Sequence, residues 1–172
     1  MNARPSSMIE PVHDAPRFEE VPHDSPHVCT VTVTEDHLST MVRHVNNVMY
    51  LEFFSQLAES HAKAEGYDLV THARSTGNAW YVLRHEIDYE REALLGDHLL
   101  LATWIDSMSR TTCRRDSIIF RLDDQGRMQA CARCTSRWIY MNIERGRPTR
   151  IPDHITRSFK PIHVQASGSA AR

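Results

Sequence analysis

A polar turn that contains a histidine leads directly into a long amphipathic segment at residues 44–50, with the sequence His-Val-Asn-Asn-Val-Met-Tyr. The amphipathic segment predicts a helix, so His44 and Asn47 are expected at a helix N-terminus. Free backbone N–H groups and the positive end of the helix dipole meet there, and they can stabilise an oxyanion or a polarised carbonyl oxygen without a metal ion. The chemistry that this turn indicates first is acyl transfer.

The predicted helix extends from about residue 47 to residue 65, because apolar side chains recur there at three- and four-residue steps. Gly66 follows and suits a left-handed cap that would end the helix. Residues 28–34 alternate, with β-branched side chains, and predict a strand before the helix. After a polar connection over 67–76, the pattern predicts strands near 78–90, 97–108, 112–123 and 127–142 and a short terminal helix near 153–159.

This order of elements predicts an α+β domain rather than alternating βαβ units. One helix cannot cover both faces of an antiparallel sheet of about five strands. The sheet is therefore expected to curl around the helix and to leave an edge or a face for a partner. We expect a homodimer or a dimer of dimers.

The folded part is expected to be a single domain over residues 27–160, which suits a chain of 172 residues with 41% hydrophobic content. Five prolines among polar residues, without helical or strand periodicity, predict a mobile N-terminal arm over residues 1–26. Small and polar residues near the C-terminus predict a loose tail over residues 161–172.

Composition limits the partners and the compartment. A net charge of −2 gives no general attraction to nucleic acid or to an acidic membrane, and no apolar run is long enough to span a bilayer. The N-terminus lacks the apolar core of a secretory signal, so a soluble cytoplasmic protein is expected. The four cysteines suggest a reducing compartment. Cys131 and Cys134 have the spacing of a metal or redox pair, but they lie in a predicted strand, so we expect ordinary cysteines, no metal and no cofactor.

Three segments in this order resemble the hotdog fold of thioesterases. The first is His44-Val-Asn-Asn47 at the start of the long helix. The second is Thr-Cys-Arg-Arg-Asp-Ser at 112–117, and the third is Cys-Thr-Ser-Arg-Trp-Ile-Tyr-Met-Asn at 134–142, followed by Arg-Gly-Arg-Pro and Ile-Pro-Asp. They are similar to acyl-ACP thioesterases and to the 4-hydroxybenzoyl-CoA thioesterase-like group. The resemblance covers about residues 28–159. It implies a hydrolase that cleaves an acyl-CoA or acyl-carrier-protein thioester to a free acid and a thiol.

The chain departs from that family at three positions. The family usually has an aspartate four residues before the histidine, an asparagine two before it, and often a glutamate at the start of the second segment. Here these positions hold Thr40, Val42 and Thr112, so only His44 carries over. A threonine hydroxyl cannot act as a general base unaided. Thr40 could donate a hydrogen bond to the thioester carbonyl, position a water, or attack if another group took its proton.

The group that activates water is left open by the sequence. His44 itself, Asp36, Glu59 and Asp116 are candidates. Some hotdog thioesterases use a helix carboxylate, so Glu59 is weighed against a solvated or subunit-contact role. One of Asn46 and Asn47 is expected to cap the helix, and His44 could be a structural hydrogen-bonding residue. The predicted catalytic set is His44, Asn47, Thr40 and Glu59.

Arg145, Arg147 and Arg150 crowd the turn before the terminal helix. Guanidinium groups suit the phosphates of coenzyme A or the acidic surface of a carrier protein, and a solvated surface is the alternative. Side chains that could line an acyl tunnel, or simply form core, are Met49, Phe53, Phe54, Trp80, Val82 and Ile105. Because the expected acids are missing, two further readings stay open: a dehydratase, cyclase or isomerase acting on a carrier-bound chain, and a catalytically silent acyl-binding subunit.

Overall fold

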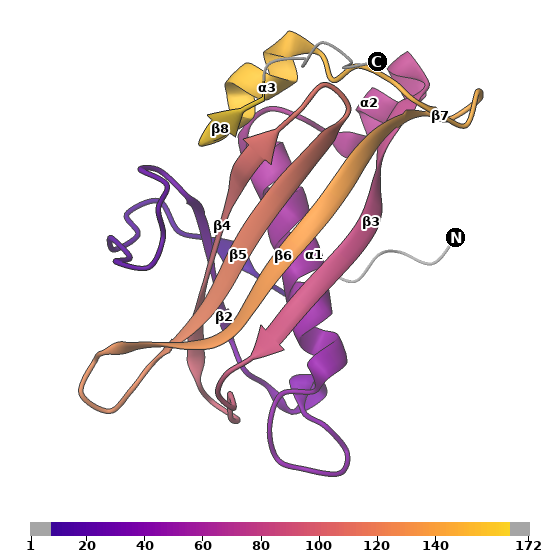
Figure 1. Ribbon diagram of the computed structural model, residues 1–172. Coiled ribbons are helices and arrows are strands. Elements are labelled where there is room, and N and C mark those ends of the chain that lie inside the picture. The colour runs from indigo at the N-terminus through magenta and orange to yellow at the C-terminus, as the bar shows by residue number, and fades with distance from the viewer. Residues whose placement is uncertain (1–7, 166–172) are drawn as a thin grey trace. The chain divides into compact units, whose positions relative to one another are not determined.

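The structure is a computed structural model that describes residues 8–165. Its helices are α1 (Asn47–Ala64), α2 (Leu69–Thr76) and α3 (Asp153–Phe159), with a short 3-10 helix η1 (Glu35–His37) (Figure 1). Its strands are β1 (Glu10–Pro11), β2 (His27–Thr32), β3 (Asn78–Tyr89), β4 (His98–Met108), β5 (Thr112–Leu122), β6 (Met128–Asn142), β7 (Arg147–Pro148) and β8 (His163–Val164).

The strands form one sheet in the order β1-β2-β4-β5-β6-β3, with β7 paired to β6 and β8 paired to β4. The predicted α+β class, with an antiparallel sheet and one long helix, is confirmed. Within residues 8–165 the sheet has eight strands rather than about five, because three two-residue strands join the five long ones. The long helix and the long strands lie where the sequence predicted them.

The connection over 67–76 was predicted only as polar, and the structure shows that it contains α2. The Asp68 side chain caps this helix by accepting a hydrogen bond from the Thr71 backbone N–H (2.6 Å). Gly77 ends it in the left-handed region at φ +67°. Eight residues without a clear apolar period carry little helical signal, so the two caps define this helix better than its interior does.

Backbone contacts divide the chain into two interleaved units. Of the described residues, the first unit holds 8–60, 87–103 and 117–134, and the second holds 61–86, 104–116 and 135–165. Each unit has its own buried cluster of apolar side chains.

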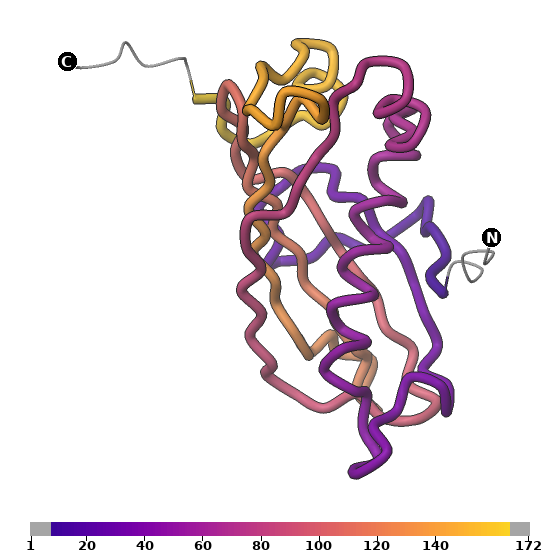
Figure 2. Tube along the Cα trace, turned by 90° about the vertical axis from the view of Figure 1, so that its right-hand side faces the viewer, coloured from indigo at the N-terminus to yellow at the C-terminus, as the bar shows by residue number. Residues whose placement is uncertain are grey.

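In the first unit, α1 packs its apolar face on the sheet, and Figure 2 shows this part of the helix beside the strands. Tyr50, Phe53, Phe54 and Leu57 share this face because they are three and four residues apart. Strand β2 pairs antiparallel with β4, from His27 opposite Thr103 to Thr32 opposite His98. The cluster that α1 covers also includes Val31, Leu99, Leu101, Ile119 and Cys131. The tunnel candidates Phe53 and Phe54 are therefore core side chains.

The N-terminal segment was predicted as a mobile arm over residues 1–26. In its described part β1 pairs with β2, and Ile9, Phe18 and Val21 are buried in the first unit. The Phe18 ring stacks on Phe120 of β5, with ring centroids 5.1 Å apart. Three apolar residues at irregular spacing give no periodic signal, yet each finds a buried position. Residues 1–7 lie outside the described part.

In the second unit, α3 packs through Ile155 and Phe159 on a cluster that includes Ile105 and Tyr140. Trp80 packs against the same cluster, whereas Val82 is exposed. The C-terminal tail was predicted over 161–172, but β8 pairs in parallel with the end of β4. The ordered chain thus continues beyond residue 160, and residues 166–172 lie outside the described part.

Cys29, Cys113, Cys131 and Cys134 are buried, and none of them forms a disulfide within the described residues. Cys131 and Cys134 lie in β6, in the strand that the sequence predicted. No helix of residues 8–165 is long and apolar enough to cross a membrane.

Candidate active site

The segment before α1 forms a small closed loop. The backbone N–H of Ser39 donates to the carbonyl oxygen of His44 (2.9 Å), which closes residues 39–44. Thr40 lies in this loop and its side chain is exposed, whereas His44 is half-buried at the base of the loop. The structure therefore places Thr40 and His44 in one short loop beside the helix start.

Two backbone hydrogen bonds anchor the junction between the loop and α1. The Val45 N–H donates to the carbonyl oxygen of Ala93 (2.9 Å), and the Asn46 N–H donates to the carbonyl oxygen of His37 (2.9 Å). Both acceptors lie outside the loop, in η1 and in the connection between β3 and β4. These bonds position the first turn of α1 and the side chains that project from it.

The His44 ring has a defined tautomer when it is neutral. Its Nδ1 lies 2.9 Å from the carbonyl oxygen of Val45, and a carbonyl can only accept a hydrogen bond. Nδ1 therefore carries the proton and Nε2 is the acceptor atom of the ring. A histidine held in this way can accept a proton from water or from a hydroxyl through Nε2.

The two asparagines at the helix start have different roles. The Asn46 Oδ1 accepts a hydrogen bond from the Val48 N–H (3.1 Å), so Asn46 is the cap that the sequence predicted for one of the pair. Asn47 is the first residue of α1 and its side chain is exposed. Its carbonyl oxygen accepts a hydrogen bond from the Tyr89 hydroxyl (3.3 Å). The side-chain amide of Asn47 is thus exposed at the first turn of α1.

Glu59 is separated from this group within one chain. It lies twelve residues beyond Asn47, which corresponds to about 18 Å along a helix that rises about 1.5 Å per residue. Its side chain is exposed. The structure brings together His44, Thr40 and Asn47 of the predicted catalytic set but leaves Glu59 apart.

Asp36 and Asp116 are the other two carboxylates that the sequence analysis considered as candidates for activating water. Asp36 is exposed in η1. Asp116 belongs to the second unit, where it accepts hydrogen bonds from Arg114 Nε (3.0 Å) and Thr135 Oγ1 (2.9 Å). Within residues 8–165, no three His, Cys, Asp or Glu side chains are arranged to hold a metal ion.

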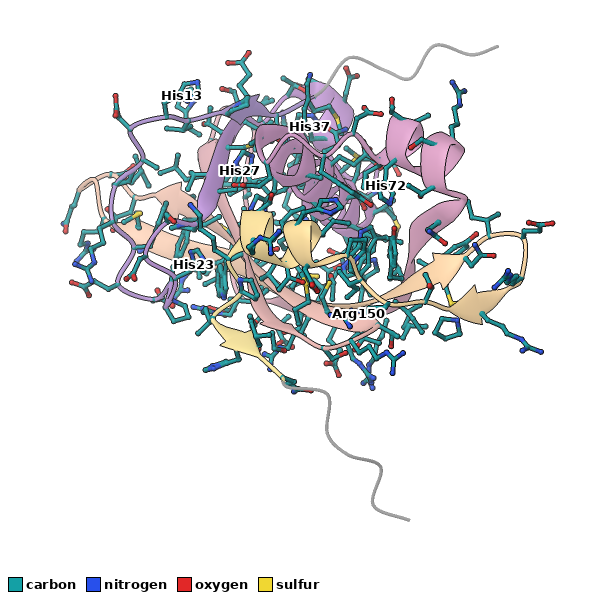
Figure 3. All side chains as sticks on the ribbon, turned by 90° about the horizontal axis from the view of Figure 1, so that it is seen from above. His13, His23, His27, His37, His72 and Arg150 are labelled. Atoms are coloured by element: carbon teal, nitrogen blue, oxygen red, sulfur yellow. The ribbon has the colours of Figure 1, made fainter. Side chains whose placement is uncertain are left out.

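His37 is a positioning residue that the sequence analysis missed. It is buried, its ring meets Phe53 edge to face at 5.2 Å, and its Nδ1 accepts a hydrogen bond from the Thr34 N–H (3.1 Å) (Figure 3). Burial lowers the pKa of His37, while the Asp36 carboxylate acts in the opposite direction. Because the His37 carbonyl holds the Asn46 N–H, this histidine fixes the entry into α1. Thr34, three residues earlier, was the available sequence signal for this capping pair.

Tyr89 is the second residue that sequence reasoning missed. It lies at the end of β3, and its ring meets Tyr50 of α1 edge to face at 5.5 Å. Burial is the main cause that raises the pKa of Tyr89, so its hydroxyl stays protonated and can donate to Asn47. No local pattern could have paired residues that are 42 positions apart.

The three predicted phosphate-binding arginines lie in the second unit, and all of them are exposed. Arg147 is in β7, and Arg145 is in the turn before it. Arg150, labelled in Figure 3, pairs with Asp153 at the start of α3 (Nη2 to Oδ1 2.8 Å). Of the three, Arg150 thus already has an ionic partner on α3.

The chain shares its sequence pattern with a known family. A family model described as the acyl-ACP thioesterase N-terminal domain matches residues 35–159. The chloroplastic acyl-[acyl-carrier-protein] hydrolase FATB3 of Cuphea viscosissima is 23% identical over 122 residues, which are 68% of this chain and 29% of that protein. The chain therefore spans less than a third of the length of this curated relative.

Solved structures share the fold. The 1,4-dihydroxy-2-naphthoyl-CoA thioesterase of Synechocystis superposes with a TM-score of 0.71 at 17% identity, covering 79% of this chain and 96% of that one. The 12:0-ACP thioesterase of Umbellularia californica gives a TM-score of 0.66 at 21% identity, covering 81% and 54%. The predicted hotdog fold is confirmed by this likeness. Because the family model runs from the loop before α1 through α3, the chain belongs to the acyl-ACP thioesterase family.

Proposed function

We propose that this protein is an acyl thioesterase that hydrolyses an acyl-CoA or acyl-carrier-protein thioester to a free acid and a thiol. The observation that carries this proposal is the start of α1, where His44 presents Nε2 as an acceptor beside the exposed Asn47 side chain and the positive end of the helix dipole. This segment lies within the part matched by the family model. The names of the plant acyl-carrier-protein hydrolase and the naphthoyl-CoA thioesterase support the class of substrate.

In this proposal the thioester carbonyl oxygen points at the N-terminus of α1. The positive end of the α1 dipole and the side-chain amide of Asn47 stabilise the negative charge that develops on this oxygen. His44 Nε2 takes a proton from a water molecule as the water oxygen bonds to the carbonyl carbon. The C–S bond of the tetrahedral intermediate then breaks, and the proton passes from His44 to the departing sulfur.

Thr40 has a supporting role in this mechanism. Its hydroxyl lies in the same closed loop as His44 and can donate a hydrogen bond to the thioester or orient the attacking water. It replaces the aspartate that the family usually has at this position, so His44 is the base we propose. Glu59 is not part of the site of its own chain, because about 18 Å of helix separates it from Asn47.

We propose that Arg145, Arg147 and Arg150 bind the phosphate groups of coenzyme A or of a carrier protein's phosphopantetheine arm. Three exposed guanidinium groups within six residues favour anionic groups, and bidentate geometry suits phosphate oxygens. Arg150 already pairs with Asp153, so Arg145 and Arg147 are expected to contribute more.

We also propose that the protein is a homodimer joined through β3. This twelve-residue strand ends the sheet order, whereas the long strand at the opposite end, β2, is partly covered by β1. Tyr81, Val82 and Leu83 of β3 are exposed apolar side chains, and an exposed, apolar edge strand favours pairing with another strand. The four buried cysteines, which form no disulfide within the described residues, support a reducing compartment such as the cytoplasm.

Thiol release from a panel of acyl-CoA and acyl-carrier-protein substrates tests the activity. His44→Ala is expected to lower kcat by about 100-fold or more, the usual contribution of a general base. Thr40→Val should lower kcat less, and Thr40→Ser should retain most of it because the hydroxyl remains. His13→Ala, at an exposed histidine of the N-terminal segment, is the matched control and should have the kcat of the wild type. No turnover of any substrate, or full activity in His44→Ala, would contradict the proposal.

A further inference from the structure

The second unit contains a cavity of about 300 Å³ that none of the proposed functional residues lines. Its walls come from the connection between α1 and α2, from α2 itself and from α3. The side chains that decide its chemistry are Glu65, Tyr67, Asp68, His72 and Phe159. Three hydroxyl-bearing residues and a second histidine complete the polar part of the wall: Thr71, Ser75, Ser158 and His154.

The charge of this cavity favours a cation. Glu65 and Asp68 contribute two carboxylates, and none of the described lining residues is a lysine or an arginine. Helix α1 ends at Ala64, next to the lining residue Glu65. The carbonyl end of a helix carries partial negative charge. A phosphate or carboxylate ligand would therefore meet like charge.

Aromatic rings form the apolar part of the wall. The Tyr67 ring lies 4.6 Å from the His72 ring and 6.2 Å from the Phe159 ring, measured between centroids. Figure 3 labels His72 on α2, and its Nε2 forms a hydrogen bond with the Tyr140 hydroxyl. Burial lowers the pKa of His72, and the neighbouring His154, which also lines the cavity, acts in the same direction. Aromatic faces next to carboxylates are a favourable environment for an ammonium group.

We propose that this cavity binds a small organic cation that carries a primary or quaternary ammonium group. The carboxylates compensate its charge, the Tyr67 and Phe159 rings contact its apolar atoms, and the hydroxyls accept hydrogen bonds from a primary ammonium. A cavity of this volume is at the lower end of the range for small-molecule sites, which limits the ligand to a compact amine. The site is independent of the thioester chemistry proposed for the first unit.

An NMR titration of the full chain tests the ligand class. Choline and ethanolamine represent the two kinds of ammonium group, while glycerol and acetate represent a neutral and an anionic molecule of similar size. The expected result is a saturable shift of the Tyr67 and His72 ring signals with at least one amine, and no saturation with glycerol or acetate. Equal binding of glycerol or acetate, or no saturation with either amine, would overturn the proposal.

A charge-neutral double variant tests the residues. Glu65→Gln with Asp68→Asn keeps the shape of both side chains, and asparagine can also cap α2 in place of Asp68. This variant should weaken the affinity for the amine at least tenfold, while Glu144→Gln, an exposed acid outside the cavity, should leave it unchanged. An unchanged affinity in a folded double variant would refute the assignment. The readout is binding, so it is separate from any result on thioester hydrolysis.

Discussion

Two histidines near the helix start are assigned opposite tautomers by their backbone partners. His44 places Nδ1 against the carbonyl oxygen of Val45, so Nδ1 must donate. His37 places Nδ1 against the backbone N–H of Thr34, so Nδ1 must accept, and its Nε2 carries the proton. Only His44 therefore offers an Nε2 lone pair to a substrate or a water. The chemical role of each ring follows from one hydrogen bond rather than from the residue type.

The buried state of His37 predicts a pH dependence of stability. Burial lowers its pKa in the folded protein, so below about pH 6.5, the ordinary value, the unfolded chain binds more protons than the folded one. The free energy of unfolding should be highest above pH 6.5 and should fall as the pH drops from 6.5 towards the folded pKa. Denaturant unfolding at pH 7.5 and pH 5 measures this loss.

A substitution separates His37 from the other titrating groups. His37→Asn keeps an acceptor for the Thr34 N–H but cannot titrate, so its loss of stability between pH 7.5 and pH 5 should be smaller. Some loss will remain, because burial also lowers the pKa values of His72 and His85. The exposed His98 is the control, and His98→Asn should lose as much as the wild type. An unchanged loss in His37→Asn would contradict the prediction.

Among the elements, α1 and the long strands could be predicted from local sequence, because the residues that favour each type of element recur within each segment. Elements that depend on distant partners could not be predicted in this way. The two-residue strands β1 and β8 exist only through pairing with β2 and β4, and α2 depends on its caps at Asp68 and Gly77. Local sequence pattern therefore predicts the long helix and the long strands, whereas the short elements depend on contacts that the local pattern does not show.

The same difference between local and non-local features applies to the candidate site. The motif at residues 44–47 predicted a loop histidine at a helix start and a capping asparagine, since both are local features. The contact between Tyr89 and Asn47 joins β3 to α1 and has no local signature. Glu59 was considered because some hotdog thioesterases use a helix carboxylate, and about 18 Å of helix separates it from Asn47.

The N-terminal segment provides a test at the level of elements. Phe18 is 4% exposed and stacks on Phe120, so Phe18→Ala should remove a buried ring and lower the free energy of unfolding by about 3 kcal/mol. Urea unfolding monitored by circular dichroism measures the change. Phe18→Leu, which keeps much of the apolar volume, should lose less. If residues 8–26 were instead a mobile arm, Phe18→Ala would have the stability of the wild type.

For the molecule as a whole, the two ends of the sheet differ in how they are protected. At one end β1 pairs with residues 29 and 30 of β2, and Ile9 beside β1 is buried in the first unit. At the other end, among residues 8–165, β3 has a sheet neighbour, β6, on one side only. Natural proteins usually protect long edge strands by covering them, charging them or pairing them. The exposed apolar side chains of β3 favour pairing with a second copy.

A charged double variant tests this association directly. Tyr81 and Leu83 lie on the same face of β3 because they are two residues apart, and they are 48% and 54% exposed. Tyr81→Glu with Leu83→Glu would place four extra negative charges at a two-fold β3 contact, so the dimer should dissociate to monomers. Light scattering after size exclusion should give twice the chain mass for the wild type and the chain mass for the variant. Leu122→Glu, which alters an equally exposed apolar residue at the end of β5, should remain dimeric. A monomeric wild type would exclude the dimer, and a dimeric double variant would show that the subunits associate through a surface other than β3.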